Sequence, residues 1–341
     1  MIHRIPARAI TVAALAATAA LALSACTPAE SGDTSSGGST ATGDYSNETY
    51  YWISQNSTLP LFVANDYPGW KDAAAQLGVK GEMVGPTNID LAAFIATIDQ
   101  VCAQKPAGVA VVGWDPSLSA SVDKCIAAGV PTITVDADLP DSKRLTFVGT
   151  DWYQIGVAQA QAMIASAKPG PVATLSILNA DNMDAARRGF SDTLEGTGFT
   201  IVANEDDTGS SETAAAKASA LLAAYPDLVG IAGFDSESGA GIVRALTEAN
   251  KVGSVAVTAM EQTPEFYQTV KDGSVAAIII QKRRLFTYYG LKTLFDYNHN
   301  AQNILGLDPT TAAPVPANID TGLLVVTKDN VDEVLKAVSS Q

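Results

Sequence analysis

The sequence predicts an α/β protein built from two doubly wound parallel sheets, and two features lead to this prediction. First, the apolar run Pro131–Asp136 ends on a carboxylate and follows a helix-like stretch, Ser117–Ala128, which Gly129 closes. Another apolar strand, Gly108–Val112, precedes that helix. A strand, a helix and a strand within about thirty residues form a βαβ unit with parallel strands. Second, the alternation continues through most of the 341 residues, which favours two lobes over one.

The beginning of the chain is predicted to be a targeting signal. Arg4 and Arg8 form a positive n-region, and Ala9–Leu21 is an apolar run that is short for a membrane span. The Leu-Ser-Ala-Cys motif that follows, ending at Cys26, resembles a bacterial lipobox, in which the cysteine is lipidated and becomes the new N-terminus. We therefore expect residues 1–25 to be a lipoprotein signal peptide. Ordinary secretory cleavage, with an incidental cysteine, is the alternative.

Residues 26–45 are predicted to form a lipid-anchored, disordered tether, because this segment consists largely of Ser, Gly, Thr, Ala and Pro. The acyl chains would hold the folded body on the outer face of the cytoplasmic membrane. Loss of Arg4 and Arg8 with the signal changes the formal charge from −15 to −17, and so acidic a body argues against binding to nucleic acid. No apolar run after the signal is long enough for a membrane span.

The first lobe is expected to begin with the strand Tyr50–Ser54 and the helix Leu61–Leu77, which Gly78 closes. Its later strands and helices are Lys80–Val84, Asp90–Gln104, Gly108–Val112, Ser117–Ala128, Thr132–Val135 and Leu145–Val148. Gly78 and Gly129 close two of these helices, and Gly129 suits a left-handed C-cap.

A second series of alternating elements is expected to begin with the helix Trp152–Ser166. Strands and helices then alternate, beginning with a strand. The strands are Val172–Leu178, Thr200–Ala203, Gly230–Ala232, Val255–Thr258 and Ala276–Ile280, and the helices between them are Met183–Leu194, Glu212–Ala224, Ser238–Glu248 and Pro264–Lys271. A further helix, Arg284–Phe295, and a last strand, Leu323–Val326, complete the pattern.

The two remaining cysteines, Cys102 and Cys125, each lie a few residues before the end of a predicted helix that leads into a core strand. Neighbouring crossover helices can bring two such residues side by side, and an exported protein favours their oxidation. We expect a Cys102–Cys125 disulfide, with two buried thiols as the alternative.

Several short fragments occur in an order that resembles the type I periplasmic binding proteins, specifically the ribose/galactose-like receptors of sugar ABC importers. The fragments lie at residues 76–80, 105–111, 127–131, 148–151, 188–190, 225–228, 271–273 and 319–322. The resemblance implies two lobes joined by three crossovers in a hinge and closing on a sugar. The N-terminal lobe would be 46–150 plus 282–318, and the C-terminal lobe 151–281 plus 319–341.

The resemblance also implies ligand-binding residues at strand ends. Asp136 matches the ligand-binding Asp of the family, Asp235 matches an Asn or Asp, and Gln281 matches a Gln. Glu261 stands where the family usually has Asp. Carboxylates accept hydrogen bonds from sugar hydroxyls, and such bonds to charged groups contribute about 1.5–3 kcal/mol each. Each of these residues has an alternative role as a cap or hinge contact.

Aromatic residues are candidates for the apolar face of a sugar ring. Phe62 matches a stacking Phe of the family, and Trp114 and Trp152 each follow a strand end, although core packing is the alternative for all three. Gln55 and Asn56 end the first strand and either bind ligand or shape the turn.

At two positions the charge of the side chain differs from that of the family. Where the family has ligand-binding arginines, this chain has Ala137 and Asp184, and Asn182 or Asp184 would take over the second position. The loss of both cations argues against an anionic ligand and for a neutral monosaccharide or polyol.

Enzyme chemistry is disfavoured. His3 leaves with the signal and His299 lies in a polar turn, so a Ser-His-Asp triad is not expected. The chain has no P-loop motif, and the calcium-like stretch 204–215 ends on Ala215 instead of a bidentate Glu. We therefore expect no cofactor and no metal.

The sequence thus predicts a monomeric extracytoplasmic receptor that binds a neutral sugar or polyol and delivers it to an ABC permease. A receptor that passes a sugar or autoinducer signal to a membrane sensor kinase is the alternative, because its folded body would look the same.

Overall fold

The computed structural model describes residues 43–260, 262–299 and 314–339. The predicted signal peptide, Cys26, the tether up to Thr42 and Glu261 lie outside the described residues. Tyr45, the last residue of the predicted tether, packs edge-on against Phe295 with ring centroids 4.9 Å apart.

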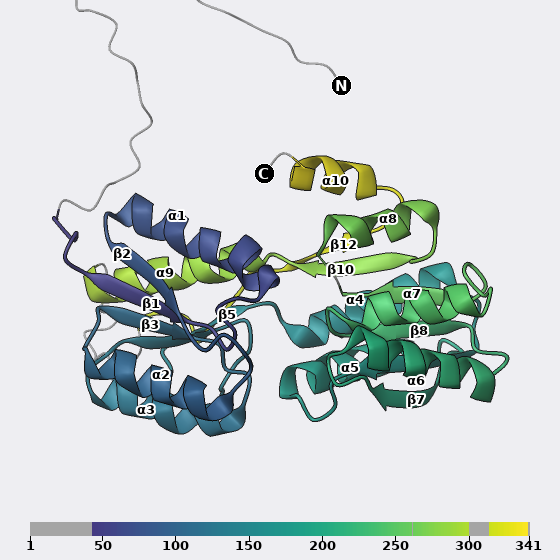
Figure 1. Cartoon of the computed structure of the whole chain (residues 1–341), viewed down its shortest axis with the longest axis horizontal. Coiled ribbons are helices and arrows are strands. Elements are labelled where there is room, and N and C mark those ends of the chain that lie inside the picture. Colours follow the sequence, from purple (N-terminus) through teal and green to yellow (C-terminus); the bar gives the residue numbers. More distant parts are fainter. Residues whose placement is uncertain (1–42, 261, 300–313, 340–341) are drawn as a thin grey trace, which may run out of the picture. The chain divides into compact units, whose positions relative to one another are not determined.

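The described chain contains two six-stranded sheets, which we call sheet A and sheet B (Figure 1). Sheet A has the order β11-β5-β4-β3-β1-β2, and all its neighbours are parallel. Its strands are β1 (Thr49–Ile53), β2 (Lys80–Val84), β3 (Gly108–Val111), β4 (Thr132–Val135), β5 (Phe147–Gly149) and β11 (Asn318–Asp320).

Sheet B has the order β12-β10-β9-β8-β6-β7 and is parallel except for β12, which pairs antiparallel with β10. Its strands are β6 (Pro171–Ser176), β7 (Thr200–Asp206), β8 (Gly230–Gly233), β9 (Ala256–Ala259), β10 (Ala277–Gln281) and β12 (Leu323–Val326). The two sheets confirm the predicted fold class of two doubly wound α/β lobes.

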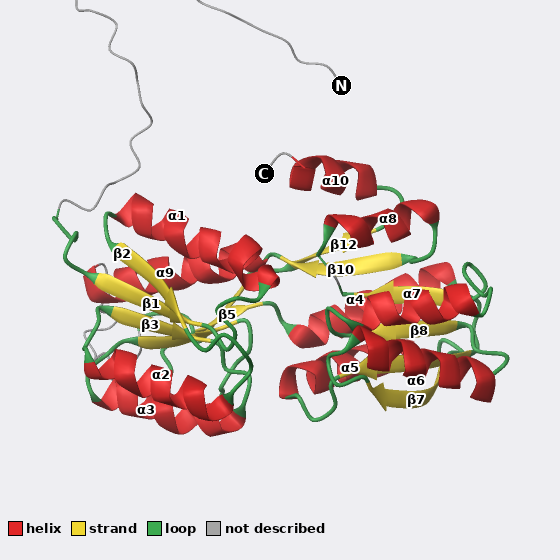
Figure 2. Cartoon of the chain, viewed as in Figure 1, coloured by secondary structure: helices red, strands yellow, loops and turns green. Residues whose placement is uncertain are grey.

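Helices cover both faces of each sheet (Figure 2). On sheet A, α1 (Tyr67–Leu77) and α9 (Arg283–His299) pack against one face, and α2 (Leu91–Ala103) and α3 (Ser119–Ala127) against the other. On sheet B, α4 (Trp152–Ser166) and α5 (Asp181–Leu194) cover one face. The other face carries α6 (Ser211–Ala224), α7 (Ser238–Glu248), α8 (Pro264–Asp272) and α10 (Val331–Ser339).

Several helices are preceded by a residue whose side chain acts as an N-cap. Asp90, Asp151, Ser210 and Thr263 each accept a hydrogen bond from a backbone N–H in the first turn of the helix that follows. Such caps satisfy backbone donors that have no partner within the helix. Gly78, at a φ of 69°, ends α1 in the left-handed conformation, and Gly129, at 78°, has the left-handed conformation predicted for it.

Three crossovers connect the sheets: β5 to α4, β10 to α9, and β11 to β12. The short strand β11, absent from the sequence prediction, pairs with β5 through Asn318, Ile319 and Asp320. The helix α9 extends to His299 and not only to Phe295, since Asn298 donates to the carbonyl of Ala107 (2.8 Å) and His299 contacts Glu48 (2.9 Å). These tertiary contacts outweigh the low helix propensity of the Asn-His segment.

A disulfide joins Cys102 at the end of α2 to Cys125 in α3, with an S–S distance of 1.93 Å. Both cysteines are buried in the core between these helices and sheet A. In the described ranges, none of the helices is both long and apolar enough to cross a membrane.

Candidate ligand-binding site

A cavity of about 650 Å³ opens where loops from both sheets meet the first and third crossovers. Four predicted site residues line it: Trp114, Trp152, Asn182 and Asp184. The carboxyl ends of parallel strands commonly form ligand crevices in open α/β sheets. The other walls are strongly acidic, with Asp138, Asp141, Asp151, Asp181 and Asp320 opposite a single lining cation, Arg188.

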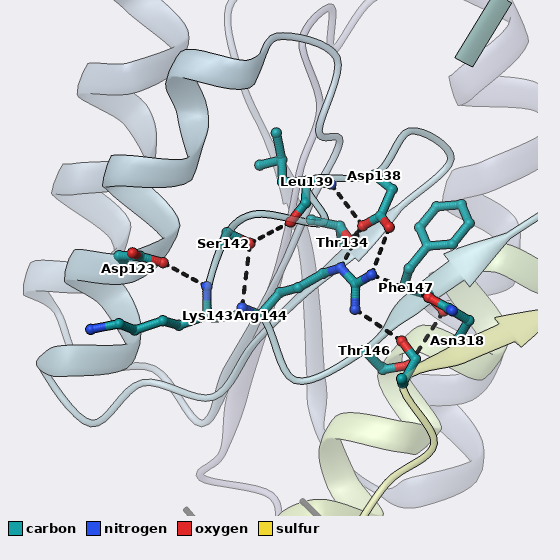
Figure 3. A network of polar contacts seen from close by, with 11 residues as sticks. Asp123, Thr134, Asp138, Leu139, Ser142, Lys143, Arg144, Thr146, Phe147 and Asn318 are labelled. Carbon is teal, nitrogen blue, oxygen red and sulfur yellow. Dashed lines mark hydrogen bonds and ion pairs between the residues drawn. The ribbon is translucent and has the colours of Figure 1, made fainter. Parts of the chain in front are cut away.

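One rim of this cavity is fixed by Arg144 (Figure 3). Its guanidinium forms an ion pair with Asp138, with Nη2 2.6 Å from Oδ2, and donates to the carbonyl of Ala317 (2.9 Å) and to Asn318 Oδ1 (3.1 Å). Thr134 donates to the same carboxylate (2.7 Å). These contacts hold the loop after β4 against the segment that enters β11.

A buried ion cluster lies beside the second crossover, where the guanidinium of Arg283 meets two carboxylates. Nε and Nη2 donate to Asp66 at 2.9 and 3.0 Å, and Nη1 and Nη2 donate to Asp136 at 2.9 and 2.8 Å. Nη1 also donates to Gln281 Oε1 at 3.2 Å. An arginine has five N–H donors, so every donor of Arg283 has an acceptor.

Burial governs the electrostatics of this cluster. Desolvation raises the pKa of Asp66 to about 7, although the charge of Arg283 lowers it. The pKa of Arg283 is raised even though burial alone would lower it, because the carboxylates of Asp136 and Asp66 favour the cation. Arg283 therefore stays charged, and Asp66 is the group that titrates near neutral pH.

Asp136 lies at the end of β4 with a φ of 68°, in the left-handed region, which Asp tolerates better than most residues. This conformation stops the strand and turns the chain toward the cavity residue Ala137. The indole N–H of Trp152 donates to the carbonyl oxygen of Asp136 (3.2 Å). The predicted residues Asp136 and Trp152, one from each lobe of the sequence prediction, are thus in contact.

Asp235, at the end of β8, lies against a second carboxyl group, Asp207. Asp235 Oδ1 accepts from the backbone N–H groups of Glu237 and Ser238, both at 2.8 Å. Ser238 Oγ donates to Asp207 Oδ2 at 2.5 Å. Burial and the neighbouring Asp235 carboxylate raise the pKa of Asp207 to about 7. Two like charges this close do not both ionise easily, so Asp207 holds a proton near neutral pH.

Several predicted site residues carry buried polar atoms without a partner, although Trp114 is the only one of these residues that lines the cavity. Among the residues that the structure describes, seven buried side-chain nitrogen or oxygen atoms have no hydrogen-bond partner. Four of them belong to predicted site residues: Gln55 Oε1, Trp114 Nε1, Asp235 Oδ2 and Gln281 Nε2. Buried polar groups are nearly always paired, so each exception calls for an explanation, such as a water, an ion or a bound molecule.

The remaining predicted residues have local roles in the structure. Asn56 Oδ1 accepts from the backbone N–H and the hydroxyl of Thr58, which is the turn-shaping alternative. Phe62 is buried at 2% exposure and packs edge-on against Trp52. Asp184 forms an ion pair with Arg187 in the first turn of α5. The roles of all these residues in binding stay predictions.

Sequence reasoning missed Asp66, Asp207 and Arg283. Arg283 lies two residues after Gln281 and directly before the predicted helix Arg284–Phe295, and nothing in this local pattern indicates a buried cation. Its carboxylate partners lie 217 and 147 residues away in the chain, so no local pattern pairs them. Asp207 follows β7 as Asp136 follows β4, and this position after a strand was the available signal.

Comparison with known proteins assigns the family. A family model described as a periplasmic binding protein domain matches residues 50–300. Among solved structures, the sugar-binding protein of a sugar ABC transporter from Bacillus halodurans has 29% sequence identity and a TM-score of 0.77, over 84% of this chain and 100% of that chain. AraP, an arabinose binding protein from Geobacillus stearothermophilus, has 30% identity and a TM-score of 0.74, over 84% and 99% of the two chains.

A chain of the XylFII–LytSN complex has 20% identity and a TM-score of 0.72, over 83% of this chain and 98% of that chain, and shows the fold alone. None of the curated proteins matches the chain. The chain belongs to the periplasmic binding proteins, within the type I group of sugar ABC transporter solute-binding proteins. The resemblance found in the sequence is confirmed.

Proposed function

We propose that this protein is an extracytoplasmic receptor that binds a neutral monosaccharide or polyol and delivers it to an ABC importer. The observation that carries the proposal is the set of four unpaired buried atoms at predicted site residues. Gln55 Oε1 and Asp235 Oδ2 are acceptors, whereas Trp114 Nε1 and Gln281 Nε2 are donors. A sugar hydroxyl both donates and accepts a hydrogen bond, so a polyol suits such a mixed set.

The charge of the cavity supports a ligand without negative charge. Six aspartates line it, and the cations Arg144 and Arg187 each pair with one of them. An anionic ligand would meet several like charges in a partly desolvated space, which is unfavourable. Neutral pentoses, hexoses and sugar alcohols carry no such penalty. We accordingly assign the protein no enzymatic role and no cofactor. Among the described residues, no cluster of His, Cys, Asp or Glu has an arrangement that would hold a metal ion.

The mechanism follows from where the site residues sit. Asp136 directly follows β4 of sheet A, whereas Asp235 lies just after β8 and Gln281 ends β10 of sheet B, so a ligand that contacts all three links the two sheets. Small dihedral changes in the three crossovers are sufficient for hinge closure. Ligand then favours the closed form by its differential affinity, and the permease recognises that form.

A thermal-shift screen tests the proposal. The panel contains L-arabinose, D-ribose, D-xylose, D-galactose, D-glucose and myo-inositol, with D-glucuronate and ribose 5-phosphate as anionic comparisons. At about one hundred times the dissociation constant, a ligand stabilises the folded state by about 2.7 kcal/mol. We expect at least one neutral compound to raise the melting temperature, and neither anion to do so.

The variants Asp136→Ala and Asp235→Ala should each abolish the shift. Asp99→Ala is the matched control, since Asp99 also has an unpaired buried oxygen but lies in α2 and pairs with Lys124. An undiminished shift in both site variants would remove these residues from the site. Tight binding of only the anionic compounds would overturn the assignment of a neutral ligand.

Anchoring by lipid is part of the proposal and has its own test. The lipobox resemblance at Cys26 indicates an acylated N-terminus. Expressed in a bacterial host, the wild-type protein should partition into the detergent phase of Triton X-114, and Cys26→Ser should move it to the aqueous phase. Equal partitioning of both forms would contradict lipidation.

A further inference from the structure

We propose that Arg283 is a positioning residue that sets Asp136 and Gln281 to read one hydroxyl of the ligand, as acceptor and donor respectively. The inference rests on the proposed function and adds a residue outside the predicted set. It starts from the pattern of hydrogen bonds around one side chain. Arg283 donates to Asp136 from two nitrogens and to Gln281 from one of the same two.

Arg283 acts through its neighbours and not by direct contact with a ligand. All five of its N–H donors already have acceptors on Asp66, Asp136 or Gln281, and its side chain is 4% exposed. A guanidinium has no acceptor atom, so no hydrogen-bonding capacity remains for a sugar. Its contribution is to fix the groups around it.

The guanidinium is itself held firmly. Its central carbon lies 5.2 Å from the ring centre of Phe62 and 5.4 Å from that of Phe286, distances at which a cation is attracted to an aromatic face. Asp66, 1% exposed, grips it with both carboxylate oxygens. The hydroxyl of Thr287 donates to the backbone carbonyl of Asp66, which ties this aspartate to α9.

Close backbone contact keeps α1 against the start of α9. A side-chain carbon at Gly69 would lie 2.0 Å from the carbonyl oxygen of Arg284, so only glycine permits this approach. Because Asp66 immediately precedes α1 and Arg283 begins α9, the contact holds the ion pair in register.

The effect on Asp136 is to set the orientation of its carboxylate. Each of its oxygens accepts one N–H of Arg283, at 2.9 and 2.8 Å, so the carboxylate is held in a bidentate arrangement. Each oxygen keeps further lone-pair capacity, and the group acts only as an acceptor. A ligand hydroxyl that meets Asp136 must therefore donate its proton.

The hydrogen bond from Arg283 fixes the orientation of the Gln281 amide and so determines which of its two polar atoms faces a ligand. Oε1 accepts from Arg283 Nη1, which places Nε2 on the opposite arm of the amide. Nε2 is buried and has no partner among the described residues, and the whole residue is 7% exposed. Since Nη1 also donates to Asp136, the carboxylate and the amide share one nitrogen and lie close together.

One ligand hydroxyl can then donate to Asp136 and accept from Gln281 Nε2. Asp136 ends β4 of sheet A and Gln281 ends β10 of sheet B, so Arg283 coordinates contacts from both sheets. Hydrogen bonds to a charged group contribute enough to change affinity by about 10- to 100-fold. Removal of that one hydroxyl should be the most costly single deletion in the ligand.

Calorimetric titration of the full-length protein tests the inference. The probes are L-arabinose, D-ribose and D-galactose, each compared with its monodeoxy derivatives. In the wild type, we expect one deoxy position to lower affinity by about 10- to 100-fold. Arg283→Lys keeps the charge but offers three donors in place of a planar fork. The ratio of the affinity for the sugar to that for this deoxy derivative should therefore shrink to below about 3-fold. Arg284→Met, next to it in an exposed ion pair with Asp72, should leave the ratio unchanged.

Gln281→Leu provides a second route if Arg283→Lys does not fold. It removes the amide donor, and we expect discrimination to weaken at the same hydroxyl. A stabilising role alone would lower the melting temperature without changing the sugar-to-deoxysugar ratio. A wild-type ratio in Arg283→Lys, an equal loss in Arg284→Met, or a loss at a different hydroxyl in Gln281→Leu would overturn the inference and leave the proposed function intact. If the protein bound none of the three sugars and no other compound of the wider panel, both the inference and the proposed function would be overturned.

Discussion

Asp136 and Asp235 are matched in position but differ in how the protein stabilises them. Each ends an internal strand, β4 in sheet A and β8 in sheet B, and each is backed by a second, more buried aspartate. Behind Asp136, Arg283 lies between the two carboxylates and bonds to both. Behind Asp235, Asp207 makes the contact directly, and Ser238 and backbone N–H groups provide the donors.

The difference shows two ways to bury a pair of acids. In sheet A a cation compensates the pair, and the excess negative charge is relieved by a proton on Asp66 when the pH is below about 7. In sheet B the proton on Asp207 takes the place of the cation. The first arrangement depends on the cation of Arg283, whereas the second needs only a neutral hydrogen-bond donor at one position.

The largest expected effect follows from removing the cation. Arg283→Met should destabilise the protein by about 3–5 kcal/mol, because it leaves Asp66 and Asp136 buried without compensation. Urea unfolding measures this loss. Arg284→Met breaks only the exposed pair with Asp72 and should cost about 1 kcal/mol or less. Similar losses in the two variants would contradict the distinction between the buried cluster and the surface pair.

A second contrast between the lobes is covalent. The disulfide Cys102–Cys125 closes a loop in the helices of sheet A, and residues 151–281 contain no cysteine. Loop-closure entropy predicts a loss of about 3 kcal/mol on reduction or in the Cys102→Ala/Cys125→Ala double variant. Calorimetry should show that the unfolding transition of the sheet A lobe moves to a lower temperature and that the transition of the sheet B lobe is unchanged. The prediction fails if reductant shifts neither transition.

The two backing aspartates predict a pH dependence with a definite sign. Because burial raises the pKa of Asp66 and Asp207 to about 7, the folded state binds more protons than the unfolded state between about pH 4 and 7. Their contribution to the free energy of unfolding is therefore full below pH 4 and is lost as the pH rises through 7.

Replacing Asp207 with a neutral amide sharpens this comparison. In Asp207→Asn the loss of stability between pH 4 and 8 should be smaller by at least about 1.4 kcal/mol, the equivalent of one pKa unit. Urea unfolding at each pH provides the measurement, with Asp206→Asn, at the last residue of β7, as control. An unchanged pH profile in Asp207→Asn would mean that Asp207 does not carry the proton.

The smallest effect concerns local structure, in which the lobes are alike. Asp90 caps α2 beside sheet A, and Ser210 caps α6 beside sheet B. Asp90→Ala and Ser210→Ala should each cost about 1 kcal/mol of unfolding free energy. A cost several times larger for either one would show that the residue supports more than the first turn of its helix.

The elements that the sequence predicted best are those whose limits are set locally. The helices Trp152–Ser166 and Ser238–Glu248 and the strand Leu323–Val326 have the predicted bounds. Asp151 caps the first of these helices with a side-chain oxygen. Such signals act within one turn of the chain and can be recognised without knowledge of the fold.

The features that escaped prediction depend on distant contacts. β11 has only three residues and exists because it pairs with β5. The Arg283 cluster joins a residue that precedes α1, a residue that follows β4 and the first residue of α9, which are far apart in the chain. Candidate site residues could be proposed from strand ends. The partners that orient Asp136 and Gln281 could not be proposed, because the packing of α1 against α9 brings Asp66 and Arg283 together.

The antiparallel strand β12 has a practical consequence for work on this protein. It forms one border of sheet B and shields the main-chain groups of β10, where Ile278 and Ile279 are fully buried. A chain cut before Leu323 would leave β10 as an open, apolar edge, on which another molecule can add a strand. Recombinant versions shortened at the C-terminus should thus form aggregates, and soluble yield depends on keeping the last strand.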